Sequence, residues 1–207
     1  PYPIGDWSRA PGSPAAERRE GALGSAAAFS LRGAEGEYQD KPLTLQEISQ
    51  LLWAAQGITG EHGMRTAPSA GALYPIELYL VAGRVDGLAA GIYRYHPKGH
   101  ELLKVAEGDR RRDLHLAALD QESLRDGAAV VVIAAVYGRT TRKYGERGIR
   151  YVHMEVGSIA ENIHLQAVSL NIGTVFVGAF DDERVKRVVN MAEGEELLAI
   201  MPLGRIP

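Results

Sequence analysis

The sequence predicts an α+β fold, because helical and strand patterns follow one another along the chain and include a hairpin. Two segments, 45–56 and 151–170, carry apolar residues at helical spacing. Residues 128–136 contain no polar side chain and are rich in β-branched residues. Such a short apolar run is typical of a central strand that is covered on both faces.

The composition is that of one ordinary globular domain with a sizeable core. The chain has 207 residues, of which 45% are hydrophobic, and a formal net charge of -3, which gives no argument for a nucleic-acid or membrane partner. It lacks both an apolar run of about 18 residues and the apolar segment of a signal peptide, so we expect a cytoplasmic protein. It also lacks cysteine, so redox chemistry would require a bound cofactor.

The first 25 residues are rich in Pro, Gly, Ser and Ala and show no sustained period. We interpret 1–25 as an N-terminal arm, in which 15–23 are able to form a short helix, and 26–207 as the folded domain. Tyr2, Ile4 and Trp7 give the arm an apolar tip. In a small domain such a tip often packs on a partner subunit.

The first long helix begins after Thr44, which is a predicted N-cap with Glu47 at the capping-box position, and it stops at Gly57. The remaining elements follow from local patterns. We predict strands at 76–81, 91–96, 101–105, 128–136, 174–180 with an interruption at Gly178, and 197–203, and helices at 109–119, 121–125, 151–170 and 181–189. Residues 137–149 are basic and are either a solvated loop or helix start, or an anion contact.

The segment from Arg65 to Tyr79 combines two prolines, one glycine and three alanines with the start of an alternating strand. A tight turn of small residues lets a ligand approach closely, and the Ser69 hydroxyl and backbone N–H groups can bind the polar edge of a flat ligand. The alternative is a plain connector between helix and strand.

Common catalytic patterns do not occur in the chain. The six histidines form no H-E-x-x-H motif and have no carboxylate at metal-ligand spacing, so no metal site is expected. There is no G-x-S-x-G, P-loop or G-x-G-x-x-G motif. Arg32 and Arg205, near the two ends of the domain, are suited to bind a phosphate.

Four segments and the closing Pro-Leu-Gly-Arg resemble the nitroreductase-like flavoproteins and, within them, the SagB-type dehydrogenases. The segments are PLTLQEISQLLWAAQGIT at 42–59, RTAPSAGALYPIELY at 65–79, RYVHMEVGSIAEN at 150–162 and GTVFVGAFDD at 173–182. The resemblance implies a nitroreductase-like α+β fold with a mostly antiparallel central sheet flanked by helices. It also implies an intertwined homodimer with FMN bound at the subunit interface.

The same resemblance assigns residues to the cofactor. Pro68, Ser69, Ala70 and Gly71 would lie along the isoalloxazine ring. The residues expected to face the ring near N5 are Val177 and Gly178, and those expected to hold the phosphate are Arg32 and Arg205.

The sequence departs from the family pattern where further phosphate contacts are expected, at Gly33, Ala34 and Gly36. Each lost charged hydrogen bond costs about 1.5 to 3 kcal/mol, so FMN binding would be weaker unless Arg150 or another arginine substitutes. Ser158 stands where this branch often has histidine.

The resemblance implies an FMN-dependent oxidoreductase that passes a hydride through flavin N5, with NADH or NADPH as the electron donor and a small-molecule substrate. In an alternative, Lys143 and Tyr144 match the Lys-Tyr pair of azoline oxidases that act on modified peptides. Lys143 would then be the base that takes the partner proton. A third hypothesis is a cofactor-free binding module of the same fold, which the altered residues 33–36 favour.

Overall fold

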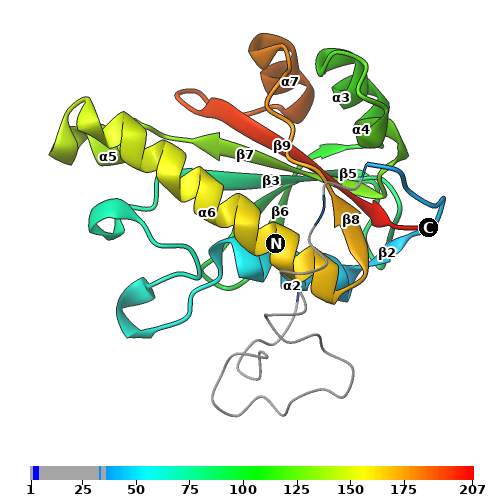
Figure 1. The fold of residues 1–207 in the computed structure, drawn as a ribbon, viewed down its shortest axis with the longest axis horizontal. Helices are drawn as coiled ribbons and strands as arrows, with labels where there is room; N and C mark the ends of the chain where they lie inside the picture. The colour runs from blue at the N-terminus through cyan, green and yellow to red at the C-terminus, as the bar shows by residue number, and fades with distance from the viewer. Residues whose placement is uncertain (1, 5–32, 34–35) are drawn as a thin grey trace.

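The computed structural model describes residues 2–4, 33 and 36–207 and arranges them around a seven-stranded sheet (Figure 1). The strand order is β1-β6-β5-β3-β7-β9-β8, and neighbouring strands are antiparallel. The prediction of an antiparallel central sheet is therefore confirmed. The strands are β1 (Tyr2–Pro3), β3 (Ile76–Ala82), β5 (Gly91–His96), β6 (Glu101–Glu107), β7 (Ala129–Ala135), β8 (Ile172–Thr174) and β9 (Glu196–Arg205), and a separate parallel pair joins β2 (Leu43–Thr44) to β4 (Val85–Asp86).

Helices cover both faces of the sheet, because successive side chains of a strand point to opposite faces. Leu78 and Leu80 pack in the core beneath α2 (Leu45–Gln56) and α6 (Arg147–Ser169). Tyr79 and Val81 pack on the other side, and the helices there are α3 (Arg111–Ala117), α4 (Glu122–Asp126) and α7 (Asp182–Val189). The result is a three-layer arrangement of helices, sheet and helices (Figure 1).

The central strand β7 confirms the interpretation of the apolar run. All of its residues are buried, with Val131 and Ile133 in the core under α2 and α6, and Val130 and Val132 in the opposite core.

The predicted helix caps are present. The Thr44 Oγ1 accepts the Glu47 N–H at 3.2 Å, and the Glu47 carboxylate accepts the Thr44 N–H at 2.8 Å. The helix α2 ends at Gly57, where an added Cβ would collide with the ring of Trp53. At α7, the Asp181 carboxylate accepts the Arg184 N–H at 3.0 Å, as the Asp cap predicts.

The basic segment 137–149 is mostly helical. It forms α5 (Gly138–Tyr144) and the first turn of α6, which begins at Arg147 rather than at the predicted 151. Gly145 separates the two helices, and its positive φ of 58° with ψ of -148° is a backbone conformation that favours glycine.

The prediction of a strand at 174–180 is wrong. The regular strand β8 ends at Thr174, and only Val177 rejoins the ladder, through a bridge to Ile200. In this register Val175 faces Pro202 of β9, and proline has no N–H to donate. The loss of that hydrogen bond interrupts the strand before Gly178.

The tip of the N-terminal arm packs on its own chain. Tyr2 and Pro3 pair with β6, the Tyr2 ring meets Tyr93 edge-on at 5.8 Å, and Ile4 is only 5% exposed. Ile4 is thus buried within its own chain, whereas Tyr2 remains 47% exposed, and the contact of the arm with a partner subunit stays a prediction. Trp7, the expected helix at 15–23, Ala34 and Arg32 lie outside the described residues.

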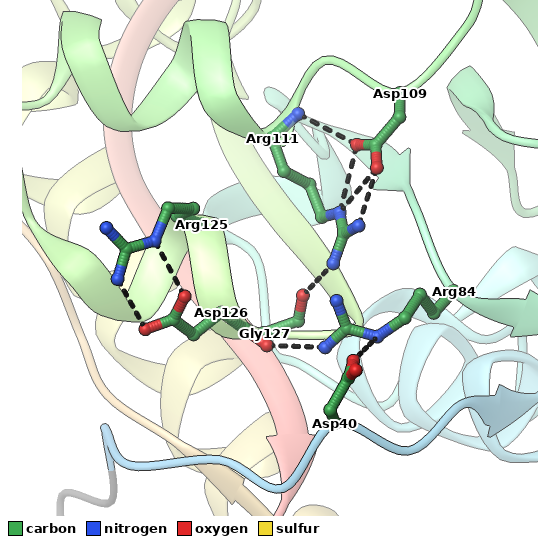
Figure 2. A network of polar contacts seen from close by, with 7 residues as sticks. All are labelled: Asp40, Arg84, Asp109, Arg111, Arg125, Asp126 and Gly127. Carbon is green, nitrogen blue, oxygen red and sulfur yellow. Dashed lines mark hydrogen bonds and ion pairs between the residues drawn. The ribbon is translucent and has the colours of Figure 1, made fainter.

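A polar network fastens α3 and α4 to the sheet (Figure 2). Arg111 is buried, pairs with Asp109 and donates to the Gly127 carbonyl at 2.5 Å. Burial alone would raise the pKa of Asp109, but its hydrogen bonds from Arg111 hold that pKa below its ordinary value. Arg84 pairs with Asp40 and donates to the carbonyl of Asp126, the last residue of α4, at 2.7 Å. This network is structural.

Candidate functional site

The turn formed by residues 68–74, called the 68–74 turn below, has an unusual backbone. Gly71, Ala72 and Tyr74 have positive φ angles of 63°, 53° and 46°. For residues with a side chain this left-handed region is sparsely populated and strained. Pro68, Gly71 and Ala72 are nevertheless exposed at the surface, so the turn presents backbone to solvent in a fixed, strained shape.

Four contacts hold Tyr74 in this conformation. Its N–H donates to Ser69 Oγ at 2.9 Å and its carbonyl accepts Arg139 Nη1 at 2.9 Å. Its hydroxyl accepts the Arg65 N–H at 3.2 Å, and the Arg65 guanidinium lies 4.3 Å from its ring centroid. Arg139 also pairs with Glu77 of β3, so α5 is tied to both the turn and the sheet.

The structure brings Lys143 and Tyr144 to the turn. A Cβ added to Gly71 would lie 2.8 Å from Tyr144 Oη and 3.0 Å from Lys143 Nζ. The Lys143 ammonium lies 5.3 Å from the Tyr144 ring centroid, and that ring meets Tyr151 edge-on at 5.2 Å. Two sets of residues that are distant in the sequence therefore share one surface.

A buried carboxylate lies beneath this surface. Glu155, on the inner side of α6, is 3% exposed, and the nearby side chains that influence its pKa are Ser69, Gln56 and Arg65. Burial raises the pKa of Glu155 to about 6, although each of these three neighbours acts in the opposite direction. At neutral pH the group is mainly a carboxylate.

The Ser69 hydroxyl accepts the Tyr74 N–H at 2.9 Å and so stabilises the turn. Its own hydrogen remains available to donate. The contact of Ser69 with a ligand stays a prediction.

Val177 and Gly178 do not join this cluster in the chain. Val177 is buried against α3, α4 and α7, and its backbone is bonded to Ile200. Gly178 is exposed beside Phe176, whose side chain is 45% exposed. Among the residues that the structure describes, no hydrogen bond or ion pair connects this segment to the 68–74 turn.

Arg205, the last residue of β9, lies at the C-terminal end of α6, because its guanidinium contacts Leu170, the C-cap of that helix. Its guanidinium pairs with Glu47 at 2.5 Å and donates to the Leu170 carbonyl at 3.3 Å. A rise of 1.5 Å per residue puts Leu170 about 22 Å from Glu155 along the helix. Arg205 and the 68–74 turn of one chain therefore form separate surfaces.

Sequence reasoning missed Glu155 and Arg139. A signal for Glu155 exists, because this acid lies three residues after Val152 and four before Ile159, on the buried stripe of a predicted helix. Of the two other positions noted in the sequence, Ser158 donates to the Met154 carbonyl at 3.1 Å and Arg150 is exposed.

No helix in the described part of the chain is long and apolar enough to cross a bilayer. The described residues also contain no group of three or more histidines, aspartates and glutamates that could hold a metal ion.

Comparison with known proteins identifies the family of this chain. The family model named "Nitroreductase family" matches residues 37–205. MJ1384 of Methanocaldococcus jannaschii, whose name assigns it provisionally as a nitroreductase, is 47% identical over 169 residues, which are 82% of this chain and 84% of MJ1384. The microcin B17-processing protein McbC of Escherichia coli is 30% identical over 72% of this chain and 57% of McbC.

A solved structure from Anabaena variabilis, also named provisionally as a nitroreductase, superposes with a TM-score of 0.79 at 31% identity. The match covers 88% of this chain but 38% of the Anabaena chain. The fold is therefore the nitroreductase fold. With the family match over most of the domain and the identity to MJ1384, we conclude that this chain belongs to the nitroreductase family.

Proposed function

We propose that the protein is an FMN-dependent oxidoreductase whose flavin ring lies on the 68–74 turn. The observation that supports this most directly is the apposition of Gly71 to Lys143 and Tyr144 on an exposed, strained backbone. The missing side chain of Gly71 makes room for Tyr144 Oη and Lys143 Nζ, so these two groups would border a flat ring that lies on the exposed backbone of the turn. The bound flavin would supply hydride transfer at N5.

The 68–74 turn and Arg205 differ in how well they fit the two parts of FMN, the ring and the phosphate. The turn offers exposed backbone with little side-chain bulk, which suits the ring. Arg205 offers a planar fork for the phosphate, but Glu47 already pairs with it, so a phosphate would compete with that carboxylate. Arg32, the second predicted phosphate contact, lies outside the described residues.

The separation of the two surfaces supports a shared site in a homodimer. An extended chain advances about 1.2 Å per bond, so the linker of about seven bonds between flavin ring and phosphate reaches about 8 to 9 Å. That length is well below the distance of about 22 Å estimated from the helical rise. We infer that the ring would lie on the turn of one protomer while Arg205 of a second copy holds the phosphate.

The residues of the chain then have distinct tasks. The turn and α5 orient the ring and shield one side of it from water, and the Lys143 ammonium can exchange a proton with a group bound beside Gly71. The sequence similarity to McbC favours a specific second candidate, the oxidation of azolines in modified peptides, with Lys143 and Tyr144 as the proton-handling pair. NADH or NADPH would serve as the donor in the general oxidoreductase.

Reconstitution with FMN tests the proposal. The apoprotein is titrated with FMN while flavin fluorescence and dimer mass are recorded, with Arg205→Ala as the variant and Arg125→Ala as the control. Arg125 is an exposed arginine that pairs with Asp126 on α4. We expect stoichiometric binding by a dimer, weakened by the loss of Arg205 and unaffected by the loss of Arg125. A protein that takes up no FMN would instead support the cofactor-free binding module.

A further inference from the structure

The buried carboxylate of Glu155 is unexpected in a hydrophobic core. It lies on the face of α6 that packs toward the 68–74 turn, among Val152, Val156 and Ile159, which are buried apolar residues. An apolar residue at this position would avoid the desolvation of a charge. The presence of an acid therefore calls for a local reason.

The polar cluster around Glu155 is incompletely satisfied. Within the described part of the chain, Glu155 Oε1 and Arg65 Nε are buried and have no hydrogen-bond partner. Arg65 is half-buried, and burial lowers its pKa from the ordinary value. Its guanidinium contacts Gln56 and lies over the Tyr74 ring. Buried polar groups without hydrogen-bond partners lower the stability of the fold. Stabilisation of the fold therefore does not explain this cluster.

The cluster does, however, reach the strained residues directly. Ser69 lies near Glu155 and acts to lower the pKa of that carboxylate, and Ser69 Oγ accepts the N–H of Tyr74. A hydroxyl that accepts from Tyr74 has its own hydrogen available to donate to the carboxylate. The path from Glu155 to Tyr74 thus runs through the Ser69 hydroxyl, and it ends at the left-handed residue that closes the turn.

We propose that Glu155 is a positioning residue, which holds the Ser69 hydroxyl and through it keeps the 68–74 turn in its left-handed shape. The part of this proposal that concerns the reaction rests on the proposed function, because a ring placed on the turn would inherit that shape. The part that concerns the turn is independent of any cofactor. A hydrogen bond to a charged group is stronger than a neutral one, which explains a carboxylate rather than an amide here.

Hydrogen exchange of the cofactor-free protein tests the proposal without any flavin. The probe is the Tyr74 amide, whose acceptor is Ser69 Oγ. The variants are Glu155→Gln, which keeps the shape and removes the charge, and Glu155→Met, which also removes the acceptor. The matched control is Glu195→Gln, because Glu195 is equally buried but bonds Tyr79 and Arg94 instead.

We expect the Tyr74 amide to exchange about tenfold faster in Glu155→Gln, and faster still in Glu155→Met, with β7 amides changing less. In Glu195→Gln the Tyr74 amide should keep its wild-type rate relative to β7. If Glu155→Met does not fold, Glu155→Gln still decides the question, since it preserves the volume of the side chain. Equal exchange at Tyr74 in the wild type and Glu155→Gln would overturn the proposal.

A double-mutant cycle separates positioning from general destabilisation. Ser69→Ala removes the acceptor of the Tyr74 N–H, so adding Glu155→Gln to it should cause little further acceleration of exchange. Fully multiplicative effects of the two substitutions would contradict a path through Ser69. If the wild type binds no FMN while these exchange results hold, the proposed function fails and the positioning role stands.

Discussion

Substitution of Gly71 by alanine should separate the shape of the turn from its contact with α5. An added Cβ would lie 2.8 Å from Tyr144 Oη and 3.0 Å from Lys143 Nζ, whereas comfortable contacts lie at about 3.5 to 4.0 Å. Each side-chain end must therefore retreat by about 0.5 to 1 Å. Both are the tips of flexible side chains, so the fold should survive.

The expected magnitudes differ for stability and for rate. A left-handed alanine costs about 1 to 2 kcal/mol, which lowers the melting temperature of a chain of this size by about 2 to 8 °C. A misplacement of about 1 Å in an active site can cost about 10²-fold in rate. We therefore expect a modest loss of stability and a large loss of activity in Gly71→Ala.

Gly63→Ala is the matched control. Gly63 lies in the same connection, has a φ of 74°, and has no atom within 4 Å of an added Cβ. Thermal denaturation should give similar losses for both variants, while the rate of NADH or NADPH oxidation with a nitroaromatic acceptor should fall only in Gly71→Ala. Equal rates in the two variants would refute the placement of the reacting ring beside Gly71.

Three further predictions concern other groups. Lys143→Ala should abolish azole formation on a cognate modified peptide while FMN stays bound, and full retained activity would exclude the azoline-oxidase alternative. Burial raises the pKa of Glu155 from 4.5 to about 6. The contribution of Glu155 to the free energy of unfolding is therefore fully present below pH 4.5 and is lost as the pH rises through 6, by at most about 2 kcal/mol. Urea denaturation should show that this decline is absent in Glu155→Gln, and an unchanged decline in the variant would contradict the raised pKa of Glu155. Burial lowers the pKa of His100 from 6.5 to about 4. Its contribution to the free energy of unfolding is therefore present above pH 6.5 and is lost as the pH falls through 4. The free energy of unfolding of His100→Gln should depend less on pH in this acid range.

Local patterns predicted most of the fold because they depend on neighbours in the sequence. The capping residues Thr44 and Glu47 and the apolar run that became β7 need no tertiary information to be identified. The strand expected at 174–180 failed for a non-local reason, since its partner across the ladder at Val175 is Pro202 of a later strand. Residues of one segment alone do not reveal such a pairing.

The candidate site was only partly predictable. The residues of the turn were identified from their composition and from the family resemblance. Their apposition to Lys143 and Tyr144 depends on how α5 is anchored by Arg139 to Tyr74 and Glu77, which is a tertiary property. The proximity of Ser69 to Glu155 depends likewise on the packing of α6, a helix far along the chain.

We propose above all that this chain binds FMN on the 68–74 turn as a dimer. The most direct test is the flavin content of the purified protein, measured by its visible absorption and by the identity of the cofactor released on denaturation. We expect a yellow dimer that releases FMN in stoichiometric amount, or a colourless dimer that takes up added FMN to that amount. A colourless protein that takes up no added FMN, or a monomer that retains flavin, would contradict it.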